Sequence, residues 1–318
     1  MRPFFENNVL QQQPFKPMII VVDTTKAGSA SNTFVLPIIK DTTETVKIYW
    51  GDGTNSTGVN GNNTHVYAAS GIYTVKIESR LFGGIYFNNL GDKAKITKIA
   101  NFGQGVSRLN IGSFYGCSSL LSIDIGNIVS NGTNAYAMFS QCTALTTVPL
   151  LNLSSVTNAY AMFAYCPVTT VPLFDLSKVT NAPYMFYQCT ALTTVPLFDL
   201  SKVTNASYMF YQCTALTTVP LLNLSSVADA TGMFLGTSLT TVPLLNLSSC
   251  TNASNMFSGV TLTTQSYSDF LINLATLPLQ SGVSFHGGNS KYNLAAAIAR
   301  AYLVSNFGWT ITDGGAAP

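Results

Sequence analysis

The sequence contains a 24-residue unit that occurs twice in succession. Residues 172–195 read PLFDLSKVTNAPYMFYQCTALTTV, and residues 196–219 repeat this text with a single change, Pro183 to Ser207. A recurring Phe carries the repeat further in both directions, at intervals of 25, 24, 23, 24, 24 and 23 residues. Each unit alone is too small to bury a core, so a period this short predicts coils that stack on their neighbours. The recurring positions are Phe114, Phe139, Phe163, Phe186, Phe210, Phe234 and Phe257.

The residues of each unit fall into columns that predict which side chains face the core. An LTTV-type strand places two apolar columns three residues apart, with pairs of Thr between them that partly face water. The Met-Phe pairs fill the core from the opposite wall, and a Pro after the second column ends each strand because it cannot donate to a ladder. We therefore expect a leucine-rich-repeat β-solenoid of about seven coils of 23–25 residues. The apolar columns are Leu145, Val168, Leu192, Leu216 and Leu239, and Val148, Val171, Val195, Val219 and Val242.

Two further columns carry polar or sulfur-containing side chains. One column has Asn in every coil but one, where Asp229 stands. Because Asn and Asp side chains bond the backbone of their own turn, this column predicts a structural ladder. Five of the six cysteines sit three residues after the repeat Phe, and Cys250 takes the place of Val156 and Val227. Their positions follow the repeat, which favours small buried thiols, although disulfides between adjacent coils stay open. The two columns are Asn134, Asn158, Asn181, Asn205 and Asn252, and Cys117, Cys142, Cys166, Cys189 and Cys213.

The segments before the repeat differ from it in composition. Residues 1–17 are polar with three prolines, which predicts an extended docking arm whose partner contacts are Phe4, Phe5 and Phe15. Residues 18–99 form a β-rich segment in which strands alternate with turns rich in Gly, Asn and Ser. The predicted strands cover residues 18–22, 33–38, 45–50 and 73–77.

The repeat array occupies residues 100–265 and ends at Gln265, which stands where the second apolar column requires Val. Residues 266–318 then form a small α/β capping segment that covers the open end of the array. Helical spacing over residues 267–278 and 293–308 predicts two helices, the second with Asn293 as N-cap and Gly308 as C-cap. A final strand follows at residues 309–312.

The β-rich segment resembles a PKD-type (polycystic-kidney-disease-repeat) domain. The resemblance rests on Trp50-Gly51-Asp52-Gly53-Thr54 and on His65-Val66-Tyr67 followed by Gly71-Ile72-Tyr73-Thr74-Val75, and it covers about a quarter of the chain. It implies an immunoglobulin-like β-sandwich that serves as a spacer or adhesion module. Asp52 is a turn former rather than a calcium ligand, because a lone carboxylate is a weak metal signal.

The coils resemble BspA-type leucine-rich repeats of bacterial surface proteins and phage tail proteins. The matching segments are VTNAYAMFAYC, VTNAPYMFYQC and VTNASYMFYQC, and the resemblance covers about half of the chain. It implies the fold of the coils, but such repeats serve many functions. Four tyrosines of the two duplicate coils stand out as a surface patch for a sugar or a protein, or as a ladder in which they pack on one another. They are Tyr184, Tyr187, Tyr208 and Tyr211.

Composition argues against several functional classes. Only 9% of the residues are charged, the net charge is +2, and no Lys/Arg cluster occurs, so we expect no nucleic-acid partner. No apolar run approaches the roughly 20 residues of a membrane span, and the first residues lack the apolar core of a secretory signal. The two histidines, His65 and His286, have no catalytic partners, and we expect a loop position for His286. We expect a non-enzymatic protein without cofactor or metal.

These observations favour a phage virion surface protein, a head or tail fibre or a decoration protein, made in the host cytoplasm. The arm would dock to other virion structural proteins, and the repeat array would meet a host surface glycan or protein. We also expect a homo-oligomer. The alternative is a bacterial cell-surface adhesin of the BspA-like type. A carbohydrate-active enzyme is the least supported, because no carboxylate pair shares a site.

Overall fold

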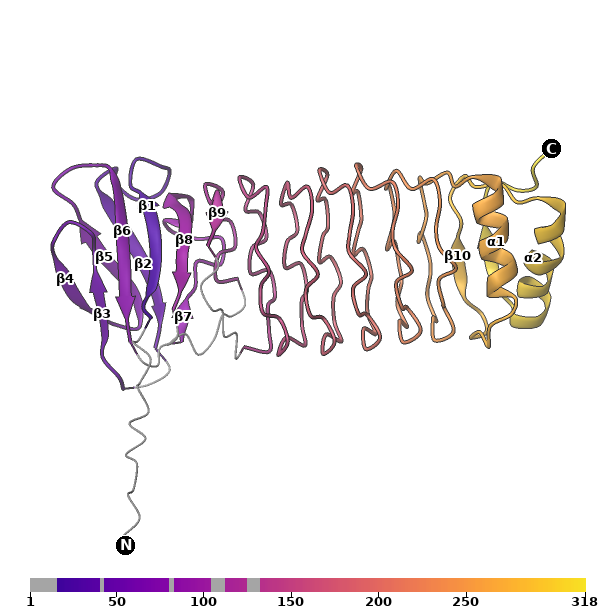
Figure 1. Ribbon diagram of the computed structural model, residues 1–318, viewed down its shortest axis with the longest axis horizontal. Helices are drawn as coiled ribbons and strands as arrows, with labels where there is room; N and C mark the ends of the chain where they lie inside the picture. Colours follow the sequence, from indigo (N-terminus) through magenta and orange to yellow (C-terminus); the bar gives the residue numbers. More distant parts are fainter. Residues whose placement is uncertain (1–15, 41–42, 80–82, 104–111, 125–131) are drawn as a thin grey trace, which may run out of the picture.

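The protein is an elongated rod with sheets at one end, a stack of coils in the middle and two helices at the other end (Figure 1). The computed structural model describes residues 16–40, 43–79, 83–103, 112–124 and 132–318. Within these residues the fold is mainly β, as the sequence predicts. The predicted arm, with Phe4, Phe5 and Phe15, lies almost entirely outside the described residues.

The N-terminal region contains two β-sheets. The larger has the strand order β4-β3-β6-β1-β8-β9 and the smaller the order β5-β2-β7. The four predicted strands are confirmed as β1, β2, β3 and β6. The strands and the short 3-10 helix η1 are β1 (Met18–Asp23), β2 (Thr33–Ile39), β3 (Val46–Tyr49), β4 (Asn55–Gly58), β5 (Gly61–Val66), β6 (Ile72–Glu78), β7 (Gly84–Ile85), η1 (Lys93–Lys95), β8 (Ile96–Phe102) and β9 (Ser122–Ile123).

The core of this region follows the alternation of apolar residues along the strands. Every second side chain of β1 and β2 is buried, because successive residues of a strand point to opposite faces. The small residue Gly58 lies where Ile38 of the smaller sheet meets Val46 and Ile48 of the larger one, so the two sheets pack on each other. Tyr67 is buried and donates its hydroxyl proton to the carbonyl oxygen of Trp50 over 2.9 Å.

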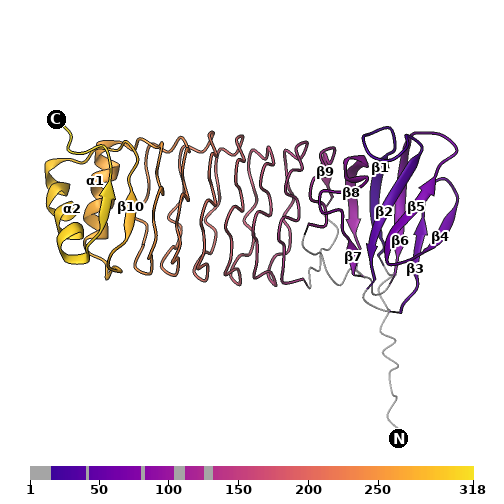
Figure 2. The ribbon, with the colours of Figure 1, turned by 180° about the vertical axis from the view of Figure 1, so that it is seen from behind.

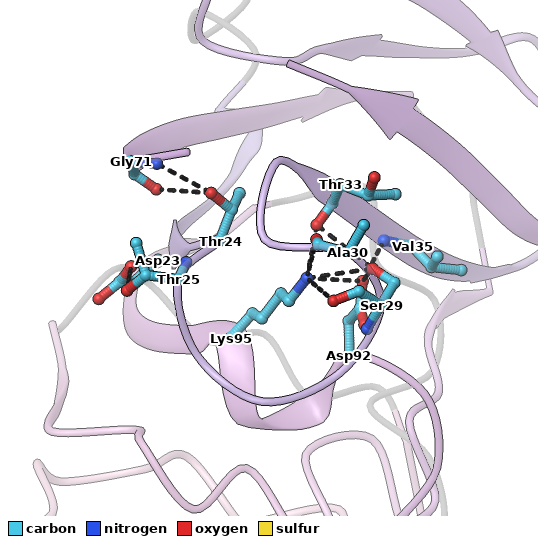
Figure 3. Close-up of polar contacts among 10 residues, drawn as sticks. All are labelled: Asp23, Thr24, Thr25, Ser29, Ala30, Thr33, Val35, Gly71, Asp92 and Lys95. Carbon is cyan, nitrogen blue, oxygen red and sulfur yellow. Dashed lines mark hydrogen bonds and ion pairs between the residues drawn. The ribbon is translucent and has the colours of Figure 1, made fainter. Parts of the chain in front are cut away.

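A buried ion pair ties the β1–β2 connection to η1 (Figure 3). Lys95 and Asp92 are 0% and 1% exposed. The Lys95 Nζ donates to the carbonyl oxygens of Ser29, Ala30 and Thr33 at 3.1, 2.9 and 2.7 Å. The Asp92 carboxylate accepts from the backbone N–H groups of Ser29 and Val35 at 2.6 and 2.7 Å. Buried charges need such partners, and no feature of the sequence predicted this pair.

The larger sheet runs directly into the stack of coils. β8 pairs antiparallel with β1 and parallel with β9, which belongs to the first coil. β8 therefore spans residues 99 and 100, where the sequence places the boundary between two domains. The Phe column starts here as well, since Phe102 of β8 packs edge-on against Phe114 with ring centroids 5.9 Å apart.

Columns of identical side chains hold the coils together. The Phe rings lie parallel on one another, for example Phe186 on Phe163 and Phe210 at 5.8 and 5.6 Å between ring centroids. The first predicted apolar column is fully buried, and the second is buried except at half-buried Val148. The predicted inward directions of both columns and of the Met-Phe pairs are thus confirmed.

The LTTV segments themselves contain no regular strand in residues 132–263, contrary to the sequence prediction. Here at most one backbone bond joins neighbouring coils, as from Thr169 N to Thr146 O over 3.2 Å, because the following Pro removes a donor. Most inter-coil bonding lies instead between the Asn and Cys columns. There the backbone N–H of every second residue donates to a carbonyl oxygen of the next coil. For example, the N–H groups of Ala137 and Phe139 donate to the carbonyl oxygens of Tyr160 and Met162 at 2.8 and 2.9 Å.

Two positions in each coil adopt left-handed backbone angles. They lie two residues before and two residues after the repeat Phe, and Ala161 and Tyr165, with φ of 50° and 64°, illustrate them. Glycine takes both places in the first coil, at Gly112 and Gly116, and again at Gly232 and Gly236, but most coils place other residues there. A non-Gly residue in this region costs roughly 1–2 kcal/mol, so stacking must overcome this local strain in most coils.

The polar and sulfur columns are confirmed as structural. The Asn column forms a run of parallel bridges from Asn134 to Asn252, and the side chains accept backbone N–H groups two residues on, as Asn158 does from Tyr160 over 3.1 Å. All six cysteines are free and buried. The Sγ of Cys166 donates to the Phe139 carbonyl oxygen over 3.0 Å, and the other cysteines three residues after a repeat Phe, from Cys142 on, bond in the same way.

The C-terminal end is covered by two helices and a small sheet (Figure 2). The helices are α1 (Thr264–Leu274) and α2 (Leu294–Phe307), and β10 (Ser284–His286) pairs in parallel with β11 (Thr310–Thr312). Asn293 caps α2 at its start and Gly308, with φ of 66°, ends it, as predicted. The expectation of a loop position for His286 was wrong, because this residue ends β10 and pairs with Thr312.

Candidate ligand-binding surface

The four predicted tyrosines lie on one side of the stack, where they pack on one another. The Tyr187 and Tyr211 rings are parallel within 6° with centroids 4.5 Å apart, and Tyr184 and Tyr208 stack at 5.2 Å. All four are half-buried. The stacking ladder, one of the two alternatives that the sequence left open, is therefore present, and most ring-face area in these two coils is already occupied.

The tyrosine surface extends into coils that sequence comparison missed. Tyr136 stacks on Tyr160 at 4.6 Å, and Tyr160 contacts Tyr184 at 5.3 Å. Tyr165 meets Tyr187 edge-on at 5.3 Å. Tyr136 and Tyr160 stand one repeat position before that of Tyr184, and Tyr165 stands one position after that of Tyr187. No single column of the aligned repeat therefore contains all of these tyrosines. The recurring text NAYAMF was the available signal, because it places a Tyr one residue earlier than NAPYMF does.

A recess of about 370 Å³ opens on this surface over the coils of Phe139 and Phe163. Its floor consists of small residues, which stand where the duplicate coils carry Tyr184 and Tyr187. Tyrosines form its rim, and Tyr136 and Tyr165 are 37% and 41% exposed. The residues that line it are Tyr115, Tyr136, Ala137, Ser140, Tyr160, Ala161, Ala164, Tyr165, Tyr184 and Tyr187.

The lining of the recess contains aromatic, methyl and hydroxyl groups but no charged side chain. Desolvation and the neighbouring Tyr165 and Tyr211 raise the pKa of Tyr187 to about 12. Desolvation by burial also raises the pKa of Tyr160 and Tyr184, and neighbouring tyrosines add to the effect. The hydroxyls therefore stay neutral at physiological pH and can both donate and accept hydrogen bonds.

A second surface feature is a row of exposed leucines that follows the Pro column. Each Leu comes directly after the Pro of its coil, and the exposed fractions range from 51% to 59%. Because the row repeats with the coils, it forms a continuous apolar stripe. The Pro-Leu pairs of the sequence contain the signal for this row. The row consists of Leu150, Leu173, Leu197, Leu221 and Leu244.

The histidines lie in separate structural settings. His65 Nε2 lies 2.7 Å from an Asp52 carboxylate oxygen, and its ring stacks on Trp50 at 4.8 Å. Asp52 also accepts from Thr54 N and Oγ1 at 3.0 and 2.6 Å. Desolvation opposes ionisation of Asp52, but the bonds from Thr54 and His65 outweigh it and hold its pKa at about 2. His286 Nδ1 accepts from Gly288 N over 3.0 Å at the other end of the rod.

Among the residues that the structure describes, no group of three or more His, Cys, Asp or Glu side chains is placed to hold a metal ion. Asp52 lies in a turn that its own side chain stabilises, as the sequence suggested. Neither of the two described helices has the length and apolar character needed to cross a membrane.

Comparison with known proteins places the repeat in a family. The model of a Mycoplasma protein family of unknown function, DUF285, matches residues 106–172, 133–243 and 169–270. The overlapping matches span just over half of the chain, which therefore belongs to this family. No curated protein and no solved structure matches the chain.

Proposed function

We propose that this protein is a non-enzymatic surface protein of a phage virion, a head or tail fibre or a decoration protein. In this proposal a PKD-like β-sandwich joins a leucine-rich-repeat solenoid, and residues 1–17 dock the chain to other virion proteins. The solenoid displays its outward columns to the host surface. The protein is made in the host cytoplasm and enters the particle during assembly.

The continuity of the rod is the observation that carries this proposal. The larger sheet passes into the first coil through the β8–β9 pairing, and the Phe column continues from Phe102 to Phe285 beside the cap. Such a rod holds one end away from the other and presents the same surface again with each coil (Figure 1). The low charge and the hydrogen-bonded side-chain columns of the described coils suit a spacer that displays a surface.

The exposed leucine row supports self-association as part of this function. A second copy in antiparallel orientation would match the same spacing, because both rows repeat with one coil. Replacing Leu173, Leu197 and Leu221 by Ser should convert the oligomer to a monomer in sedimentation velocity, with an unchanged circular-dichroism spectrum. A wild-type monomer at micromolar concentration would remove this part of the proposal.

A bacterial cell-surface adhesin of the BspA-like type is the second candidate. The family match favours it, because the family description names Mycoplasma, a bacterial genus. The same rod would then stand on a cell rather than on a particle.

Mass spectrometry of purified virions separates the two candidates. We expect the protein in particles, and we expect a variant without residues 1–17 to fold but to be missing from them. Normal incorporation of that variant would argue against the docking role of Phe4, Phe5 and Phe15. Absence of the wild-type chain from particles, with its presence on bacterial membranes, would replace the first candidate by the second.

A further inference from the structure

We propose that the tyrosine-rimmed recess over the coils of Phe139 and Phe163 binds a neutral pyranose ring of a saccharide. This inference deepens the proposed attachment function and rests on it for its biological setting. It moves the centre of the binding site from the four tyrosines of the duplicate coils to the two preceding coils, and it keeps Tyr184 and Tyr187 as part of the lining.

The recess exists because two coils lack side chains that their neighbours carry. The residue after the repeat Phe is Tyr115 in one coil, Ser140 and Ala164 in the next two, and Tyr187 in the fourth. Adjacent coils lie about 4.8 Å apart, the usual strand spacing. Two missing aromatic side chains therefore leave a gap of roughly 10–14 Å along the rod between two tyrosines.

The far end of this gap offers an aromatic face. Tyr211 covers one face of Tyr187 at 4.5 Å and Tyr165 meets the same ring edge-on at 5.3 Å, while the Tyr165 ring is itself 41% exposed at the rim. The apolar C–H face of a pyranose can lie against such a ring, while its hydroxyls meet the tyrosine hydroxyls at the rim. The volume of about 370 Å³ lies at the lower end of the range for small-molecule sites.

The absence of charge in the lining selects the class of ligand. A phosphate, sulfate or uronate would lose its hydration without gaining a charged partner, which is unfavourable. A neutral hexose or N-acetylhexosamine loses no charge solvation. An aromatic side chain of a protein partner could fill the same volume, but it would leave most rim hydroxyls without a new partner.

Two variants fill the recess with side chains that the same column already carries elsewhere. Ala164→Tyr copies Tyr187, and Ser140→Leu copies Leu235. Leu235→Tyr is the matched control, because it adds a Tyr to the same column outside the recess. Folding of each variant is checked by circular dichroism and thermal unfolding, and Ser140→Leu keeps the test decisive if Ala164→Tyr does not fold.

The purified full chain is screened against immobilised neutral oligosaccharides of glucose, mannose, galactose and N-acetylglucosamine, with sulfated and uronate oligosaccharides and a Tyr-rich peptide as further probes. We expect binding to at least one neutral oligosaccharide, a loss of at least tenfold in Ala164→Tyr and Ser140→Leu, and a change below twofold in Leu235→Tyr. No binding to neutral probes, preference for the charged probes or the peptide, or equal binding by the filled variants would each overturn the inference.

The outcomes also separate this inference from the proposed function. Saccharide binding by a chain that is absent from virions would leave the recess assigned and remove the virion proposal. A virion protein that binds no neutral saccharide would keep the proposal and remove the recess as its receptor site.

Discussion

The N-terminal sheets and the coil stack achieve a packed core in different ways. In the sheets, regular strands alternate buried and exposed residues, and single contacts such as Lys95 with Asp92 join distant segments. In the described coils beyond β9, no regular strand occurs, yet the Phe, Cys and first apolar columns are buried throughout. The sheets depend on contacts that occur once, whereas the stack depends on contacts that occur in every coil.

This difference determines how much each region tolerates change. A unique buried contact has no substitute when one partner is removed. A repeated column loses one of several equivalent contacts, and the neighbouring coils keep theirs. We therefore expect substitutions at unique contacts of the sheets to cost more free energy of unfolding than substitutions in the repeated columns.

Lys95→Met should have the largest effect, a loss of about 3–5 kcal/mol in the free energy of unfolding, because it leaves the buried Asp92 carboxylate without its cation. Chemical denaturation followed by the fluorescence of Trp50, in a Trp309→Phe background, measures this loss. The double variant Lys95→Met/Asp92→Leu should recover a large part of it. A loss below about 1 kcal/mol for the single variant would mean that the ion pair does not hold the β1–β2 connection.

Phe186→Ala should cost about 3 kcal/mol, the lower end of the usual cost of deleting a buried Phe, because the neighbouring coils keep their contacts, and the effect should be concentrated in the stack. Tyr211→Ala, at the end of the surface ladder, is the control and should cost about 1 kcal/mol, since it loses one stacked pair. Hydrogen exchange measured by mass spectrometry should rise in coils next to residue 186 and stay unchanged in β1 and β6. A rise of equal size in both regions would contradict separate cooperative units.

The effect of acid on the Asp52 turn in the sheets should be smaller. The pKa of Asp52 in the folded chain is about 2, below its ordinary value of 3.8. A depressed pKa contributes stability above the unfolded value and loses it as the pH falls toward the folded value. The stability difference between wild type and Asp52→Asn should thus be constant above about pH 5 and shrink between pH 4 and pH 2. A difference that is constant down to pH 2 would contradict the assigned hydrogen bonds.

Ser207→Pro should have the smallest effect, within about 0.5 kcal/mol, because residue 183 of the preceding coil is already Pro. Ser207 N donates only to the Asn205 side chain, over 2.9 Å. The inter-coil bond at this position is accepted by the Ser207 carbonyl oxygen, which a Pro would keep, and the Pro183 carbonyl oxygen accepts the equivalent bond. The loss of the two bonds that Ser207 N and Oγ donate to Asn205 Oδ1 and the lower entropy of the unfolded chain oppose each other. Differential scanning calorimetry checks this, and a decrease of more than about 5 °C in Tm would show that the two coils are not equivalent.

The sequence predicted what the repeat itself encodes. The buried columns, the Asn ladder and the free cysteines follow from residue types at a fixed period, and the caps of α2 follow from Asn293 and Gly308 at the ends of a helical pattern. The absence of strands in the LTTV segments was not predicted, because alternation indicates burial but not how many backbone donors find a partner. The Pro column indicates this loss of donors, because Pro has no backbone N–H to give to a neighbouring coil.

Features formed by single residues could not be predicted from the sequence. Lys95 and Asp92 are three residues apart, but their partners Ser29 and Val35 come from more than 50 residues away. The recess depends on Ala164 and Ser140 standing between tyrosines of other coils, and on a Tyr displaced by one residue. Only the stacking order and the left-handed turns bring these side chains together.

We conclude that the stack consists of exchangeable coils, and a chain without residues 196–219, which form one coil, provides the test of this claim. Small-angle scattering of the deleted chain should show a rod shorter by about one coil spacing, about 4.8 Å. Its thiols, whose pKa values burial raises to about 12 at Cys166, should stay unreactive toward a disulfide reagent at pH 8 until the chain is unfolded. An expanded chain with rapidly reacting thiols would contradict the claim, because the coils would then depend on their particular neighbours.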